Sequence, residues 1–284
     1  DGRLYLTAAR ENAMQFDVSA ALDAFGEGQD QWLNLSPDGN WLLISSERAD
    51  VRCKGWACLY IAPSNLSQLE LVLVNNEPIH SDYSLAASGG NLLILTQDGG
   101  PHDRDLWVTK RLTVGWSQPV LLTSASPYGF NILPSISAAG DKVVFTCTPD
   151  PYAQEGSALC EVKADGSSFK VILKPESGPN GTASNSLREP AYASDGSIIF
   201  EADWNGEQIW RLPPGSSQPM LINLEMGNDN SPCILPDGNI VSLWLARPGS
   251  NGVHELKAMN ADGSSYFMII AGQDISDTGI SCGQ

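Results

Sequence analysis

The chain has 284 residues, of which 33 are acidic and 16 are basic, so its net charge at neutral pH is −17. A surface of that charge repels the phosphates of nucleic acids, which excludes them as partners, and it suits cations or basic protein patches. No apolar run reaches the roughly 18 residues of a membrane-spanning helix, and a hydrophobic content of 42% is enough for one large domain, residues 1–284.

The predicted elements begin with an Asp-Gly turn and an apolar strand within residues 1–6. A second such turn, Asp38-Gly39, lies between a short strand and the apolar strand Trp41–Ser45. Glycine suits the turn because it adopts a positive φ without a steric penalty. A third strand over Cys58–Ala62 and a fourth over Leu69–Val74 complete the unit. Four antiparallel strands of this kind form one blade of a β-propeller.

The same unit recurs along the chain. Its anchor glycines are 51, 50, 56 and 42 residues apart, at Gly39, Gly90, Gly140, Gly196 and Gly238. This spacing is typical of propeller blades, whose period is about 40 to 50 residues. We therefore predict an all-β fold, a six-bladed β-propeller of four-stranded antiparallel blades. The blades are expected at about residues 33–80, 83–130, 133–186, 189–228, 231–274, and 277–284 together with 1–30.

The sixth blade is predicted to be split between the two ends of the chain. Residues 278–284 resemble the strand that precedes an Asp-Gly turn, and such a turn opens the chain at Asp1-Gly2. We expect the C-terminal segment to supply the inner strand of this blade and the N-terminal segment to supply its outer strands. Pairing of the two ends would close the ring and remove its exposed edges.

The cysteines favour a framework of disulfides. They are Cys53, Cys58, Cys147, Cys160, Cys233 and Cys282. The first two flank a tight segment, and the next two lie at the facing ends of two strand-like runs, where hairpin neighbours come close enough to bond. The last two fall in the inner strands of the fifth and sixth blades, as a bridge or as two buried thiols. Because persistent disulfides indicate an oxidising compartment, we expect a periplasmic or extracellular location and a processed, mature form.

A family resemblance rests on the turns and on prolines before the inner strands. Asn230 and Pro232 precede Pro236-Asp237-Gly238, Pro190 precedes Ser194-Asp195-Gly196, and Pro134 precedes Gly140. These units, each followed by a strand of Leu, Ile, Val or Phe, resemble the TolB-like (WD40-like) propeller repeat, although the first two units lack the proline. The resemblance covers nearly the whole chain and implies the propeller fold. It implies no single function, because one fold carries many functions.

Few residues point to catalysis. The three histidines are His80, His102 and His254, and the last lies in a different blade from the others, which argues against a three-histidine metal site. The G-x-S-x-G, H-E-x-x-H, phosphate-loop and calcium-loop patterns are absent. We therefore favour a protein that is not an enzyme. No cofactor is expected to be required, and a divalent cation such as calcium remains an option.

Two groups of residues are predicted to bind a ligand on the face that carries the loops between second and third strands. One group precedes the inner strands and surrounds the mouth of the central channel: Asp30, Asp82, Asn131, Arg188, Asp229 and Asp277. The other group is aromatic: Trp32, Trp56, Tyr128, Phe130, Tyr152 and Trp204. Charged groups around an opening suit a divalent cation, an ammonium group or a sugar. Exposed aromatic rings suit sugars or protein anchors, and packing between blades is the alternative for at least half of them.

Together these features predict a non-catalytic extracytoplasmic binding propeller that presents its loop-rich face to a protein or glycan. The alternative is an extracellular carbohydrate-active hydrolase or lyase that uses carboxylates at the channel mouth, because paired carboxylates can hydrolyse glycosides. We expect a monomer, or a module of a larger surface protein.

Overall fold

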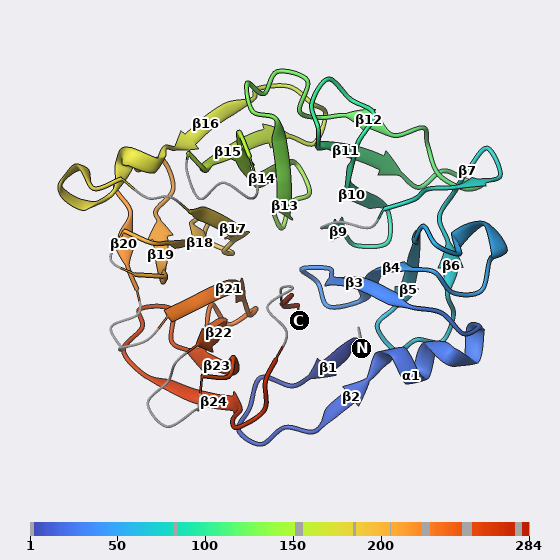
Figure 1. Cartoon of the computed structure of the whole chain (residues 1–284), viewed down its shortest axis with the longest axis horizontal. Coiled ribbons are helices and arrows are strands. Elements are labelled where there is room, and N and C mark those ends of the chain that lie inside the picture. Colours follow the sequence, from blue (N-terminus) through green and yellow to red (C-terminus); the bar gives the residue numbers. More distant parts are fainter. Residues whose placement is uncertain are drawn as a thin grey trace.

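The computed structural model describes residues 3–81, 85–150, 156–183, 186–204, 206–222, 228–245, 252–275 and 280–283. Within these residues, five four-stranded antiparallel sheets stand around a common centre, and each sheet is one propeller blade (Figure 1). The strands of each blade follow one another in chain order from the centre outward. The predicted propeller of four-stranded antiparallel blades is therefore confirmed.

The strand bounds follow the repeat. Blade 1 contains β3 (Asp30–Leu35), β4 (Trp41–Ser46), β5 (Cys58–Pro63) and β6 (Glu70–Leu71). Blade 2 contains β9 (Leu85–Ser88), β10 (Leu92–Gln97), β11 (Asp105–Lys110) and β12 (Val120–Leu121). Blade 3 contains β13 (Phe130–Ile136), β14 (Lys142–Thr148), β15 (Ala158–Lys163) and β16 (Lys170–Leu173). Blade 4 contains β17 (Leu187–Tyr192), β18 (Ile198–Ala202), β19 (Gln208–Leu212) and β20 (Met220–Leu221). Blade 5 contains β21 (Asn228–Ile234), β22 (Ile240–Leu245), β23 (Glu255–Met259) and β24 (Tyr266–Ile270).

The smaller elements lie between and beside the blades. Two-stranded sheets pair β1 (Tyr5–Thr7) with β2 (Gln15–Asp17) and β7 (Leu73–Val74) with β8 (Glu77–Pro78). The one described α-helix is α1 (Val18–Leu22), and short 3₁₀ helices cover Asp23–Phe25, Val51–Cys53, Pro175–Ser177 and Pro179–Gly181. No helix among the described residues has the length and apolarity needed to cross a lipid bilayer.

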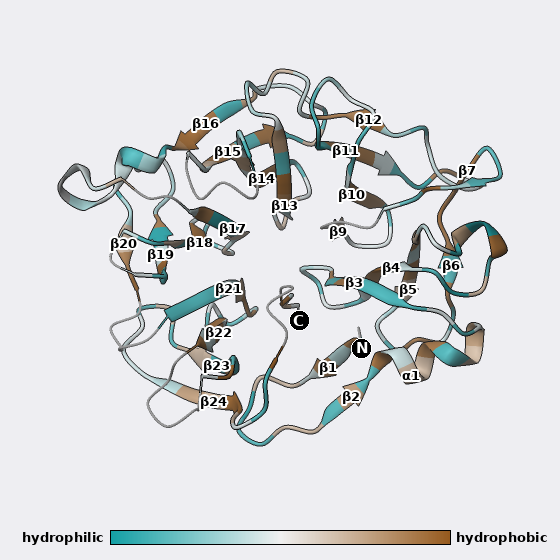
Figure 2. Cartoon of the chain, in the orientation of Figure 1, coloured by the Kyte–Doolittle hydropathy of each residue, from teal (hydrophilic) through white to brown (hydrophobic). Residues whose placement is uncertain are grey.

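The hydrophobic core is divided into layers between neighbouring blades. Leu43 of blade 1 packs with Leu93 of blade 2, for example, and Ile199 of blade 4 packs with Ile240 of blade 5. Figure 2 shows hydrophobic colours mainly on the strands and hydrophilic colours mainly on the connecting loops. Each blade therefore buries both of its faces against neighbours, which explains why strands such as β4 are almost continuously buried.

One anchor glycine has a role that differs from the prediction. Gly39, Gly140, Gly196 and Gly238 adopt positive φ in their turns, but in blade 2 the positive φ belongs to Gly89. A Cβ atom at Gly90 would lie 2.6 Å from the ring of Trp41 in blade 1. Gly90 is therefore needed for close approach between two blades.

The inner strands of blades 3, 4 and 5 share a bulge next to a proline. The residue before each proline adopts a positive φ: Leu133 at 55°, Glu189 at 51° and Ser231 at 50°. At the same points the pairing with the second strand shifts register. Proline is tolerated there because an innermost strand has one edge without a ladder partner.

The prediction of a sixth four-stranded blade was wrong, because five such blades are present among the described residues. Among the described residues, the sector between blades 5 and 1 contains a two-stranded sheet, β1–β2, with residues 280–283 on its inner side (Figure 1). Asp17 caps the start of α1 by accepting a hydrogen bond from the Ala20 backbone N–H at 2.9 Å. A helix therefore follows β2 where the other blades have a fourth strand, and residues 280–283 form no strand.

The three predicted disulfides are confirmed. Cys53–Cys58, Cys147–Cys160 and Cys233–Cys282 are bonded, so the last pair is a bridge and not two thiols. Three disulfides in one chain are typical of an oxidising, extracytoplasmic compartment.

Candidate functional site

The loop-bearing face is the side of the ring that carries the loops between second and third strands and the connections between blades. Trp56 lies in the β4–β5 loop of blade 1, and His80 lies in the connection from blade 1 to blade 2. Their rings are stacked with centroids 4.1 Å apart and planes inclined by 11°. The two kinds of loop therefore share one face, as the sequence predicted.

Asp30, predicted at the channel mouth, is buried in a polar network within the protein. The Arg48 Nη2 and Nε atoms donate to its carboxylate oxygens at 2.6 and 2.9 Å. The Ser46 and Ser19 hydroxyl groups donate to the same carboxylate at 2.7 and 2.6 Å. The charge of Asp30 is therefore balanced by an equally buried guanidinium group, which gives this carboxylate a structural role.

Asp229 has a similar arrangement in blade 5. The Lys257 Nζ atom donates to its carboxylate at 2.9 Å, and the Ser242 hydroxyl group donates at 3.0 Å. The ammonium group of Lys257 also lies 4.2 Å from the centroid of the Trp244 ring. Both charged side chains are fully buried, so the pair is part of the interior of the blade.

Asn131 is also buried, and two of the other predicted mouth residues lie outside the described residues. The Asn131 side chain accepts a hydrogen bond from Ser126 at 2.7 Å and donates one to the Arg104 carbonyl oxygen at 3.2 Å. Arg188 is exposed on β17. Asp82 and Asp277 are the two that the structure does not describe. Binding of a ligand by the six residues stays a prediction, and the burial of three of them does not favour it.

The predicted aromatic residues occupy different environments. Trp204 lies in the core, where its ring meets Trp210 edge to face at 4.9 Å and its Nε1 donates to the Pro175 carbonyl oxygen at 2.9 Å. Trp32 and Tyr128 are partly buried against the layers between blades. Phe130 is half-buried at the start of β13, and Tyr152 lies outside the described residues.

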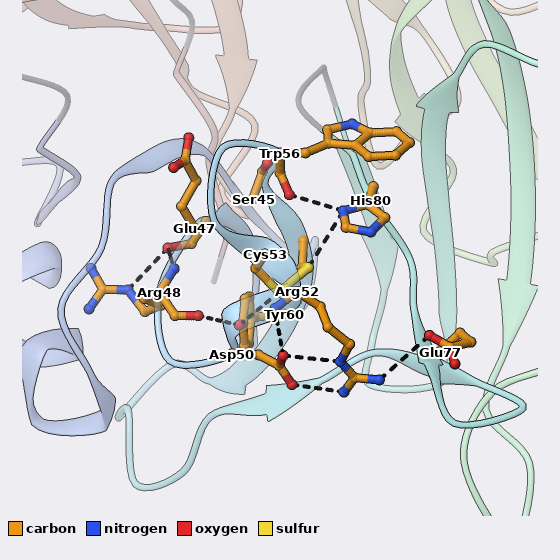
Figure 3. Close-up of a disulfide and its surroundings, with 12 residues drawn as sticks. Ser45, Glu47, Arg48, Asp50, Arg52, Cys53, Trp56, Tyr60, Glu77 and His80 are labelled. Atoms are coloured by element: carbon orange, nitrogen blue, oxygen red, sulfur yellow. Dashed lines mark hydrogen bonds and ion pairs between the residues drawn. A yellow bond between two sulfur atoms is a disulfide. The ribbon is translucent and has the colours of Figure 1, made fainter.

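Trp56 differs from the other predicted aromatic residues because 55% of its surface is exposed. Its loop is braced by the Cys53–Cys58 disulfide, and both sulfur atoms are buried (Figure 3). The Gly55 backbone N–H donates to the Glu47 carboxylate at 2.9 Å, which ties the loop to the end of β4. The His80 Nδ1 atom lies 2.9 Å from the Trp56 carbonyl oxygen. Since a carbonyl oxygen only accepts, this nitrogen carries the proton. We call Trp56 and His80 the aromatic platform.

Three charged residues near the platform, Asp50, Arg52 and Glu77, are paired with one another. Arg52 donates to the Asp50 carboxylate at 2.7 Å, and its Nη1 lies 3.6 Å from a Glu77 carboxylate oxygen (Figure 3). Hydrogen bonds from the Arg52 side chain and backbone lower the pKa of Asp50 to about 2. Asp50 is therefore ionised at neutral pH.

Glu201 is the residue with unusual acid–base behaviour that sequence reasoning missed. It lies on β18, opposite Arg188 in the ladder, and is only 6% exposed. Burial raises its pKa to about 8, and the negative charge of Glu189 acts in the same direction. A single acidic residue within the apolar run Ile198–Ala202 was the available signal.

The centre of the ring contains a cavity of about 230 Å³, lined by the inner strands. Its walls are about equally polar and apolar, and the lining includes the bulge residues Leu133 and Glu189 with the three prolines that follow the bulges. Among the described residues that line the cavity, Glu189 is the one carboxylate.

The described residues contain no group of three or more His, Cys, Asp or Glu side chains that could hold a metal ion. His102 instead contacts Asp105 at 2.8 Å, and the His254 Nδ1 lies 3.6 Å from Asp274. The predicted option of a calcium ion is not tested by this geometry.

Comparison with known proteins establishes the fold. No protein-family model matches the chain, and no curated protein matches its sequence. A TolB from Agrobacterium tumefaciens has a similar structure, with a TM-score of 0.61 and 18% identity, over 87% of this chain and 83% of that protein. This chain has a TolB-like β-propeller fold.

Two further structures extend the likeness. TolB from Acinetobacter baumannii has a TM-score of 0.58 and 14% identity, over 95% of this chain and 68% of that protein. A puromycin-hydrolyzing peptidase from Mycobacterium tuberculosis has a TM-score of 0.59 and 12% identity, over 99% of this chain and 46% of that protein. At such identities the likeness concerns the fold alone, and for the fold it confirms the predicted TolB-like resemblance.

Proposed function

We propose that this chain is a non-catalytic binding propeller that uses its loop-bearing face to hold a protein or a glycan. The observation that carries the proposal is the aromatic platform, in which an exposed indole ring is held rigidly by a disulfide and by a stacked imidazole ring. A rigid, exposed tryptophan is typical of binding anchors, because it buries a large area at a small entropic cost. Rigid scaffolds usually carry function on such loops.

The proposal includes a location and a closed ring. Three disulfides support a periplasmic or extracellular protein. Closure by the two ends is supported by contacts of the C-terminal segment with both neighbouring blades. Ser281 accepts a hydrogen bond from the Leu35 backbone N–H at 2.9 Å in blade 1, and Cys282 is bonded to Cys233 in blade 5.

The test uses a photo-crosslinking amino acid at one of two exposed lysines. Lys54 is close to Trp56 in the sequence and lies on the loop-bearing face. Lys110 is the last residue of β11 and lies on the opposite face of the propeller. Either replacement removes one positive charge, so the two variants are matched. In the native extracytoplasmic fraction, we expect adducts of defined mass from position 54 and none from position 110. Adducts only from position 110 would contradict the proposal.

The carbohydrate-active hydrolase or lyase is retained as a second candidate because of Glu201 and Glu189. A carboxyl group whose pKa is raised to about 8, mainly by burial and also by the charge of a second carboxylate, has one property of a general acid in glycoside hydrolysis. If this candidate is correct, purified protein releases reducing ends or unsaturated products from an oligosaccharide panel. The Glu201→Gln variant should then lose at least 100-fold in rate. Absence of turnover across the panel supports the binding propeller.

A further inference from the structure

The aromatic platform has one face available to a ligand. The His80 ring covers one face of the Trp56 indole at a centroid distance of 4.1 Å, yet 55% of the Trp56 surface is exposed. The exposed part of the indole ring therefore lies on its opposite face and its edge. The His80 backbone is also held, because Gln97 donates a hydrogen bond to its carbonyl oxygen and Cys58 pairs with it in a β-bridge. A ligand thus meets an indole face that is already in place.

The charge of the protein selects the class of ligand. With 33 acidic and 16 basic residues, the protein attracts positively charged surfaces over distances beyond contact. The face of an indole ring is the negative end of its quadrupole, and tryptophan is the best aromatic partner for a cation. The same contact occurs among the described residues, between the buried Lys257 and Trp244 at 4.2 Å and between the partly exposed Arg111 and Trp116 at 4.6 Å.

A neutral sugar fits the same surface less well. Sugar binding combines stacking with hydrogen bonds from the hydroxyl groups to polar side chains beside the ring. Here Glu47 already accepts from Gly55 and Gln31. Asp50 and Glu77 are both held by Arg52. These carboxylates therefore have fewer free acceptor positions for the hydroxyl groups of a sugar. Because Arg52 and Lys54 offset their charge locally, the attraction for a cation comes from the acidic surface of the whole protein.

Within the proposed function, we propose that the exposed face of Trp56 binds a lysine or arginine side chain of a basic partner protein. The cationic head lies over the indole ring, and the acidic surface supplies attraction at longer range. The proposal deepens the binding propeller by choosing a basic protein over a glycan. It makes Trp56 the anchor and gives His80 a positioning role.

The probe for this site is a fluorescent hexa-arginine peptide, whose binding is measured by fluorescence anisotropy. Trp56→Ala and Val51→Ala are compared with the unmodified protein, and Trp56→Phe serves as a conservative variant. Val51 is a matched control because it is 78% exposed and lies on the 3₁₀ helix of the same loop. None of these substitutions changes the net charge, so a difference in Kd reports the indole ring and not the bulk field.

We expect Trp56→Ala to weaken binding of the peptide about 5- to 30-fold, with Trp56→Phe intermediate. Val51→Ala should stay within about twofold, and circular dichroism should show that every variant is folded. Salt should weaken binding to all variants while the ratio between them persists. Equal affinity of Trp56→Ala and the unmodified protein would overturn the proposal. So would tighter binding of a neutral oligosaccharide that is lost in Trp56→Ala.

Failure of the cationic contact at Trp56 can be distinguished from failure of the proposed binding function. Crosslinking from position 54 tests whether the loop-bearing face meets a partner at all, whatever the charge of that partner. If adducts form there while Trp56→Ala binds the peptide normally, the binding propeller stands and the cationic contact is rejected.

Discussion

Lys257 and Asp229 form an ion pair with no exposed side-chain surface inside blade 5. We predict that Lys257→Met lowers the free energy of unfolding by about 3–5 kcal/mol, because it leaves a buried carboxylate without its cation. Urea denaturation measures this change. In the double variant Lys257→Met/Asp229→Asn the loss should be smaller, since no buried charge remains. A loss under about 1 kcal/mol in the single variant would show that the charge is compensated in another way.

Glu201 predicts a pH dependence of stability. Its pKa is raised from 4.5 to about 8 on folding, mainly by burial. The folded state therefore holds a proton that the unfolded state has released at intermediate pH. The stabilisation is fully present below pH 4.5 and is lost as the pH rises towards 8, by up to about 1.4 kcal/mol per pH unit.

The measurement is the free energy of unfolding of the unmodified protein and of Glu201→Gln at pH 5 and at pH 8. Because glutamine stays neutral, the variant should gain stability relative to the unmodified protein at pH 8. A difference between the two proteins that does not change with pH would contradict the raised pKa.

At the scale of one element, the bulged inner strands are joined to the preceding blade by side chains on second strands. The Glu189 backbone N–H donates to Thr146 Oγ1 of blade 3 at 3.2 Å. The Ser231 backbone N–H donates to the Glu201 carboxyl group of blade 4. Both donors belong to residues with positive φ. The bulge therefore turns a backbone N–H towards the neighbouring blade, and the resulting hydrogen bond joins the two blades.

The bulge predicts that variants at Ser231, whose φ is 50°, have an unusual order of stability. Ser231→Gly should be more stable than Ser231→Ala by about 1 kcal/mol, because only glycine adopts the left-handed region freely. In an ordinary strand the order is reversed, so Ala258→Gly in β23 should be destabilising. Thermal unfolding of the three variants provides the comparison. An alanine variant more stable than the glycine variant at position 231 would contradict the strained conformation.

At the scale of the whole molecule, the C-terminal segment links blade 5 to blade 1. We predict that Cys233→Ser/Cys282→Ser lowers the free energy of unfolding by about 4 kcal/mol, because the bridge closes a loop of 49 residues. Cys53→Ser/Cys58→Ser is the control, because its loop spans only 5 residues and loop-closure entropy gives about 2 kcal/mol. Guanidinium denaturation under non-reducing conditions compares the two. Equal losses would indicate that residues 280–283 do not hold the ring together.

The sequence by itself determined the repeated blade, the strand order within it, the disulfides Cys53–Cys58 and Cys147–Cys160, and the face on which Trp56 lies, whereas it left Cys233 and Cys282 as a bridge or two thiols. These features depend on local signals, namely the Asp-Gly turns, alternating strands and cysteines in neighbouring strands. The sixth sector was predicted less well. A repeat of four strands was extended to residues 1–30, whereas capping by Asp17 starts a helix after β2.

Only the tertiary structure decided the environment of the polar residues. In the sequence, Asp30 and Asp229 resemble solvent-facing ligands. Their partners are 18 and 28 residues away, Arg48 in the loop after β4 and Lys257 on β23. The same holds for His80, which reaches Trp56 from the next connection. Local patterns set where strands begin and end. Burial and charge pairing depend on which strands pack together. The local pattern does not specify those contacts.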